Sequence, residues 1–163
     1  MISYTNASLV PCEALAQETS DEETLMSLIL RHAIKIDAPI ELVFRALSQV
    51  KHIAAWHHGP VQGDLAVGEV LYINPSSDLK FGWKTNEIVG CERIAQECVE
   101  GPEGSLGKQV VYTLSSRGPR STLLELTDGQ WEEGDGHLAS CNTHWGGALY
   151  RLKAYIELEM SGS

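Results

Sequence analysis

The sequence has few of the residues that would suit it to nucleic acid or to a membrane. Lys and Arg number 12 against 22 Asp and Glu, which gives a formal net charge of −10. This surplus of negative charge repels phosphate backbones and anionic lipid surfaces. The chain also lacks the run of roughly 18 to 20 apolar residues that spans a bilayer, and its start lacks the pattern of a secretory leader. We therefore expect neither nucleic acid nor a membrane as partner, and a cytoplasmic location.

Cysteine is also sparse, and the common catalytic motifs are absent. Four cysteines, Cys12, Cys91, Cys98 and Cys141, are scattered without a C-x-x-C pair. A chain of this size closes a core without disulfides, so we expect reduced thiols. No G-x-S-x-G, Walker, Rossmann or H-E-x-x-H pattern occurs. Their absence excludes the common hydrolase, nucleotide-binding and metalloprotease classes.

What the chain does contain is enough apolar material for one core. Its 163 residues, 43% of them hydrophobic, suit a single globular domain. Residues 1–24 mix small, polar and acidic side chains without sustained periodicity. We expect them to form a loosely held arm or a short helix capped by Ser20. The single domain is expected to occupy residues 25–160.

Hydrophobic periodicity predicts an α+β fold. Leu30–Ile36 alternates in the manner of a strand, and Pro39 then begins an amphipathic helix through Leu47. A second short helix is predicted at Val50–Trp56, before the Gly-Pro turn. An apolar stripe predicts a long final helix over His137–Leu158. Between these helices, turn residues separate an antiparallel meander, with strands at Val67–Ile73, Lys80–Val89, Glu92–Val99, Gln109–Ser115 and Ser121–Thr127.

This order is the helix-grip arrangement, in which a curved antiparallel sheet wraps around a long C-terminal helix, with two short helices after the first strand. The motifs that agree with it are Ile34-x-Ile36-x-Ala38-Pro39-x-Glu41-x-Val43-Phe44-x-Ala46-Leu47, Trp56, Val67-Gly68-Glu69, Glu87-Ile88 with Arg93-Ile94, Thr122-x-Leu124-x-Leu126, and His144-Trp145-Gly146 with Leu149-x-x-Leu152-Lys153-x-Tyr155-Ile156-Glu157. Together they resemble the family of homologues of the activator of the heat shock protein 90 ATPase, in the START/birch-pollen-allergen-like (SRPBCC) superfamily. The resemblance covers roughly residues 28 to 158.

The resemblance implies a deep, largely apolar cavity between the sheet and the final helix, which binds or transforms a hydrophobic small molecule such as a lipid or a polyketide. Alternation along the strands, together with Trp145 on the final helix, predicts its walls, and the turn after the second helix predicts its mouth. The candidate ligand-binding residues are Trp56, His57, His58, Leu71, Ile73, Phe81, Trp83, Tyr112, Leu114, Leu124, Asn142, Trp145 and Leu149. The alternative interpretation of the apolar members is that they pack a closed core.

Three further interpretations concern chemistry and partners. His137, Cys141 and His144 share a narrow arc of the final helix, but their spacing matches no established zinc signature, so we expect no metal and no cofactor. An enzyme of the cyclase or dehydratase kind, with His57 or His58 as proton shuttle, is the alternative to reversible binding. A chaperone-associated module is the third hypothesis, suggested by the family name, although the chaperone activator carries an additional N-terminal domain for which this chain has no space. The sequence leaves a homodimer open.

Overall fold

The computed structural model describes residues 27–57 and 59–160 of the chain. These residues form an α+β fold, as the sequence predicts. The expected arm, Cys12 and His58 lie outside the described residues. In chain order, the elements are β1 (Leu28–Ile36), α2 (Ile40–Ser48), α3 (Val50–Trp56), β2 (Val61–Gly63), β3 (Val70–Ser76), β4 (Leu79–Val89), β5 (Arg93–Glu100), β6 (Gln109–Gly118), β7 (Ser121–Trp131), α4 (Leu138–Tyr155) and the π-helical turn η1 (Ile156–Met160).

The strands form one antiparallel sheet in the order β1-β7-β6-β5-β4-β3-β2. From β2 to β7 the chain is a meander, and β1 closes the order by pairing with β7. Ile34 lies opposite Leu124, which lies opposite Leu114, so apolar side chains form rows across the sheet. Because side chains alternate along each strand, these rows all point to one face.

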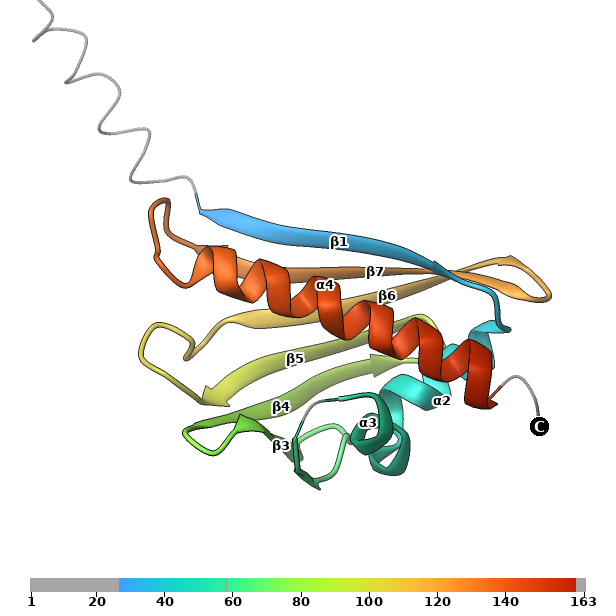
Figure 1. The fold of residues 1–163 in the computed structure, drawn as a ribbon, viewed down its shortest axis with the longest axis horizontal. Helices are drawn as coiled ribbons and strands as arrows, with labels where there is room; N and C mark the ends of the chain where they lie inside the picture. Colours follow the sequence, from blue (N-terminus) through green and yellow to red (C-terminus); the bar gives the residue numbers. More distant parts are fainter. Residues whose placement is uncertain (1–26, 58, 161–163) are drawn as a thin grey trace, which may run out of the picture.

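Helix α4 covers that apolar face and crosses it diagonally, while α2 and α3 close one end (Figure 1). Ile36, Leu152 and Ile156 are fully buried where the helix meets the sheet. Bulges shift the register within β4, and such bulges bend a strand. No helix in residues 27–57 and 59–160 is both long and apolar enough to cross a membrane.

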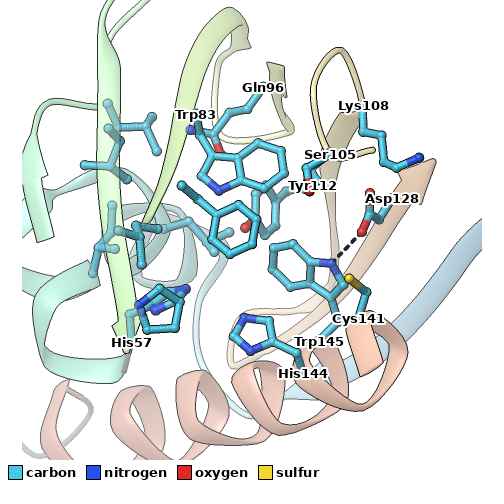
Figure 2. A pocket seen from close by; sticks show the side chains of 18 of the residues that line it. His57, Trp83, Gln96, Ser105, Lys108, Tyr112, Asp128, Cys141, His144 and Trp145 are labelled. Carbon is cyan, nitrogen blue, oxygen red and sulfur yellow. Dashed lines mark hydrogen bonds between the residues drawn. The ribbon is translucent and has the colours of Figure 1, made fainter. Parts of the chain in front are cut away.

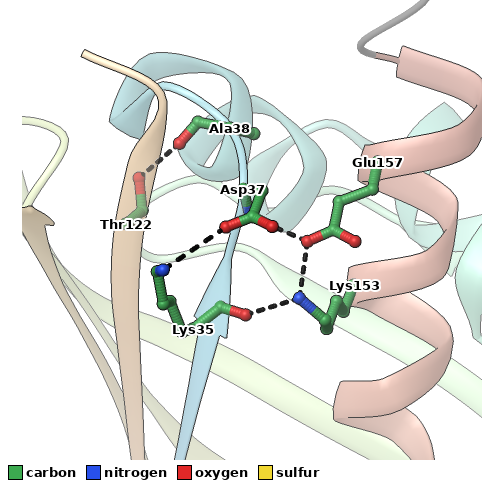
Figure 3. Close-up of polar contacts among 6 residues, drawn as sticks. All are labelled: Lys35, Asp37, Ala38, Thr122, Lys153 and Glu157. Atoms are coloured by element: carbon green, nitrogen blue, oxygen red, sulfur yellow. Dashed lines mark hydrogen bonds and ion pairs between the residues drawn. The ribbon is translucent and has the colours of Figure 1, made fainter. Parts of the chain in front are cut away.

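The last turns of α4 are fixed to the end of β1 by a polar network (Figure 3). The Lys153 ammonium donates to the Lys35 carbonyl at 2.8 Å and to the Glu157 carboxylate at 2.6 Å. The same carboxylate accepts a hydrogen bond from the Asp37 backbone N–H at 2.8 Å. Beside them the buried Thr122 hydroxyl donates to the Ala38 carbonyl at 2.8 Å. This network holds the helix across the sheet at the end away from its first turn.

The element boundaries differ from the prediction at several places, and three of these differences lie beside the cavity or at the edges of the sheet. The short strand β2 was not expected, because three residues are too few to reveal a period of two. Strand β3 begins at Val70 rather than Val67, since Gly68 adopts a φ of +90° and its N–H donates to the Thr85 carbonyl in a turn. At the other end of the sheet, β7 continues past Thr127 to Trp131.

Candidate ligand-binding cavity

A cavity lies between the sheet, α3 and the first half of α4. Its enclosed volume is about 70 Å³, several times what one water molecule occupies on that measure. With the open space at its mouth included, the space between the lining atoms is about 800 Å³. The cavity therefore has room for a guest and an opening through which it can enter.

Aromatic side chains dominate the cavity wall. The four tryptophans of the sequence, Trp56, Trp83, Trp131 and Trp145, all line it. Phe81 stacks on Trp83 with ring centroids 6.1 Å apart, and the Tyr112 ring meets Trp145 edge-on at 6.3 Å. Aromatic rings offer large apolar area at a low entropic cost, and their edges and faces pack well against another ring. The wall thus favours an apolar or aromatic guest.

Hydrogen bonds hold two of these tryptophans in place. The Trp56 indole N–H donates to the Ala46 carbonyl of α2 at 3.0 Å, which turns the ring inward from the end of α3. Arg151 of α4 donates to the Trp56 carbonyl at 3.3 Å. On the opposite side the Trp145 indole N–H donates to the Asp128 carboxylate at 2.8 Å (Figure 2). Both rings are therefore positioned before any ligand arrives.

The charged side chains of the cavity lie together at one end of it (Figure 2). Asp128 on β7 is 3% exposed. Burial raises the pKa of its carboxyl, and the Trp145 hydrogen bond and the Lys108 charge oppose that rise. The Lys108 ammonium lies 4.1 Å from the centre of the Trp131 ring and donates to the Gln130 carbonyl. Lys108 and Asp128 are the lysine and the aspartate that line the cavity, and among the described residues the lining contains no arginine or glutamate.

The remaining titratable groups near that end are neutral. Burial raises the pKa of the Tyr112 hydroxyl, and the nearby Asp128 charge raises it further. Burial likewise raises the pKa of the Cys141 thiol. The buried Gln96 amide donates to Thr85 at 3.4 Å. These groups add hydrogen-bonding capacity to the wall without adding charge.

Two histidines lie next to each other on the cavity wall, away from Lys108 and Asp128 (Figure 2). The His57 and His144 rings are 5.8 Å apart, and His57 also lies 5.2 Å from the Trp56 ring. The cap of α3 places His57, and α4 presents His144 one residue before Trp145. His144 thus belongs to the cavity rather than to the exposed flank of the helix.

The structure brings together eight of the residues that the sequence suggested as a ligand site: Trp56, His57, Leu71, Ile73, Phe81, Trp83, Tyr112 and Trp145 all line the cavity. Leu114, Leu124 and Leu149 instead pack in the core, because α2 and the second half of α4 close the space over that end of β6 and β7. Asn142 is exposed on α4 outside the lining.

The cavity also contains residues that the sequence analysis did not select. Asp128 follows the predicted end of β7, and continuing the alternation of Thr122, Leu124 and Leu126 by one step would have placed it inward. Trp131 needs a register shift between Leu28 and Ile29 to face inward, for which the sequence gives no signal. The other unselected residues are Leu47, Ile53, Leu65, Pro75, Gln96, Ser105, Lys108 and Val110.

The helical trio does not form a metal site in the structure. His137 is exposed, whereas Cys141 and His144 line the cavity. Among the residues described, no group of three or more His, Cys, Asp or Glu side chains is placed to hold a metal ion.

Comparison with known proteins agrees with this fold. The family model described as "Activator of Hsp90 ATPase homolog 1-like protein" matches residues 37–157. No curated protein sequence matches the chain. Three solved structures share the fold at low identity, which by itself carries no function. The Aha1 dimer from Colwellia psychrerythraea has 22% identity over 80% of this chain and 97% of that chain, with a TM-score of 0.74.

Two further solved structures cover a similar share of this chain. CalU16 from Micromonospora echinospora has 22% identity over 82% of this chain and 68% of that chain, with a TM-score of 0.67. MLL2253 from Mesorhizobium loti has 16% identity over 81% of this chain and 98% of that chain, with a TM-score of 0.68. Because the family model covers most of the sequence, the chain belongs to the Activator of Hsp90 ATPase homolog 1-like family, within the SRPBCC superfamily of helix-grip domains.

Proposed function

We propose that the protein reversibly binds a small hydrophobic molecule, lipid- or polyketide-like, in the cavity between the sheet and α4. The observation that carries this proposal is a cavity lined by four tryptophans, with its two charged side chains, Lys108 and Asp128, side by side at one end (Figure 2). Membership of the helix-grip superfamily supports it. We place this activity in the cytoplasm, in keeping with three free thiols at Cys91, Cys98 and Cys141.

The energetics favour an apolar guest. Removing apolar surface from water gains about 25 cal/mol per Å², so a guest that buries about 200 Å² gains about 5 kcal/mol before the costs of ordering it. The walls are already held by hydrogen bonds at Trp56 and Trp145. Preorganised walls reduce the ordering cost on the protein side.

Native mass spectrometry of freshly purified protein tests the proposal. We expect a species heavier than the chain, whose extra mass leaves on denaturation and is identified in the organic extract. The opposite result is a bare chain that also forms no adduct with a panel of lipid- and polyketide-like compounds. That result would mean that the cavity does not serve as a binding site.

A cyclase or dehydratase is the second candidate, because His57 and His144 lie close together on the cavity wall. Imidazole titrates near neutral pH and is the commonest general acid or base. Returning the extracted molecule to fresh protein separates the two functions. An unchanged mass together with an unchanged NMR spectrum of the molecule indicates reversible binding. Loss of water or ring closure, abolished by His57→Asn, indicates an enzyme.

A third candidate follows from the family description, which names an activator of the Hsp90 ATPase. We rank it below ligand binding, because a cavity walled by aromatic residues is not needed for contact with a chaperone surface. The test is the ATPase rate of Hsp90 with and without this protein. We expect no change, and a stimulated rate would favour the chaperone-associated role.

Self-association is a further part of the proposal. The relative from Colwellia psychrerythraea was solved as a dimer. In this chain Tyr150 and Leu158, on the outer face of α4 and on η1, are 71% and 79% exposed. Sedimentation velocity measures the assembly directly. We expect a homodimer that Tyr150→Lys weakens, whereas a monomer at all concentrations would contradict it.

A further inference from the structure

Two polar atoms beside the cavity are buried without a hydrogen-bond partner among the residues described. One is the Asp128 Oδ1 atom, an acceptor, and the other is the Trp131 Nε1 atom, a donor. Both residues line the cavity and are 3% exposed. A buried polar group that is left unpaired costs about 1–3 kcal/mol. Each such group therefore calls for an explanation, and a missing ligand is one.

The fold of β7 brings these two atoms to the same place. Asp128 points inward by simple alternation after Leu126, since both are buried on one face of the strand. Trp131 is brought to the same face because the register with β1 shifts, from Gly129 opposite Ile29 to Trp131 opposite Leu28. The Trp131 indole N–H acts on the carboxyl as a hydrogen-bond donor, which opposes the rise in its pKa that burial causes, but the contact falls outside the geometry of a direct hydrogen bond.

The neighbouring hydrogen bonds leave both atoms unused. The other Asp128 oxygen, Oδ2, already accepts from the Trp145 indole. Lys108, the cation nearest this end, donates to the Gln130 carbonyl and lies over the face of Trp131.

From this pairing we infer that the ligand of the proposed cavity carries a hydroxyl group, which donates to Asp128 Oδ1 and accepts from Trp131 Nε1. The inference rests on the proposed binding function and specifies its ligand as an apolar alcohol or phenol. A hydroxyl is the smallest ligand group that both donates and accepts, and it does so through a single oxygen atom. An ammonium cannot accept from the indole, a ketone cannot donate to the carboxylate, and a ligand carboxylate is repelled by Asp128.

Calorimetric titration with a matched pair of probes tests the inference. The probes are 4-propylphenol and 4-propyltoluene, which differ by a hydroxyl in place of a methyl group. A hydrogen bond to a charged group predicts that the phenol binds about tenfold more tightly. In Trp131→Phe, which keeps a ring but removes the N–H donor, this preference should fall severalfold. The matched control is Trp83→Phe on the same wall, which should change both affinities alike.

The outcomes separate the inference from the proposed function. Equal affinity of the native protein for the two probes would overturn the hydroxyl site and leave the apolar cavity standing. Binding of neither probe would count against the cavity function itself. As a second readout, the Trp131 indole N–H resonance should shift with the phenol and much less with the toluene. A preference for the phenol that survives in Trp131→Phe, without that shift, would also overturn the inference.

Discussion

At the scale of the residue, the unusual feature is a carboxylate placed in an aromatic cavity. On burial, the Asp128 carboxyl loses its contacts with water and accepts a hydrogen bond from the Trp145 indole N–H. Burying an ionised group costs free energy unless it is fully paired. A carboxyl group that lies in a cleft and has a pKa shifted by burial is a candidate for a functional site. This pattern is why we assign Asp128 to the ligand rather than to the fold.

The pH dependence of stability follows from the same residue. Because burial raises the pKa of Asp128 above its ordinary 3.8, the folded protein holds this proton more tightly than the unfolded chain. The contribution of Asp128 to the free energy of unfolding therefore falls as the pH rises from 3.8 through the pKa of Asp128 in the folded protein. We predict that Asp128→Asn raises the free energy of unfolding at pH 7, and that its advantage disappears below pH 3.8, where both forms are neutral.

Urea unfolding over a series of pH values measures this effect. The matched control is Asp78→Asn, because Asp78 is exposed in the turn between β3 and β4. Its substitution should leave the pH dependence nearly unchanged. If Asp128→Asn were less stable than the native protein at pH 7, the carboxylate would contribute to the fold instead.

At the scale of the element, α4 is tied to β1 by charge-assisted hydrogen bonds. Partial burial raises the pKa of Glu157, but the Asp37 N–H and Lys153 outweigh it, so the net shift is downward. Its carboxylate therefore stabilises the fold above pH 4.5, and this contribution is lost as the pH falls through the lowered folded value. The network fixes the angle at which the helix crosses the sheet.

We predict that Glu157→Gln lowers the free energy of unfolding by about 0.5–1 kcal/mol at pH 7. The difference from the native protein should vanish at low pH, where Glu157 is protonated. Thermal unfolding of both proteins at several pH values checks this. Glu159→Gln, at an exposed site two residues further on, is the control and should show little change. An equal loss in both variants would mean that general charge, not the link to β1, matters.

The elements themselves were largely predictable, because each long one carries a clear period. Helix α3 has the predicted bounds, and α2, β4 and β5 differ from prediction by a residue or two at their ends. Short β2 carries too little sequence for a pattern, and the late start of β3 depends on the turn at Gly68. Such features are decided by backbone contacts to Thr85 rather than by local hydrophobicity.

The candidate site was predictable only where alternation decides which face a side chain occupies. Tyr112, Leu71 and Ile73 follow from that rule. The rule does not tell which inward side chains pack against a helix and which line the cavity. For this reason Leu124 was predicted to line the cavity, although it packs in the core. Trp131 needs a register shift that depends on the partner strand.

At the scale of the whole molecule, the cavity exists because α4 packs closely at only one end of the sheet. Near η1 the helix is held by Glu157 and by the buried Ile156. Toward its first turn, aromatic rings rather than aliphatic core side chains separate it from the strands. Space remains there because large rigid rings held at their edges cannot collapse to fill it.

Filling this space should remove binding without removing the fold. Val110 is buried on the cavity wall, and we predict that Val110→Phe lowers the affinity for 4-propyltoluene about tenfold or more. The control is Val111→Phe on the same strand, which points to the opposite face and should leave binding unchanged. Calorimetry measures the affinities, and circular dichroism checks that both variants fold. Undiminished binding in Val110→Phe would place the ligand elsewhere.

The most direct test of the central claim is a ¹H–¹⁵N NMR titration of the native protein with 4-propyltoluene. All four tryptophans line the cavity, so each indole N–H reports on it. We expect the indole signals of Trp56, Trp83 and Trp145 to shift together and saturate, while the amides of Tyr150 and Leu158 on the outer surface remain still. Indole signals that do not move, or shifts confined to the outer surface, would contradict it.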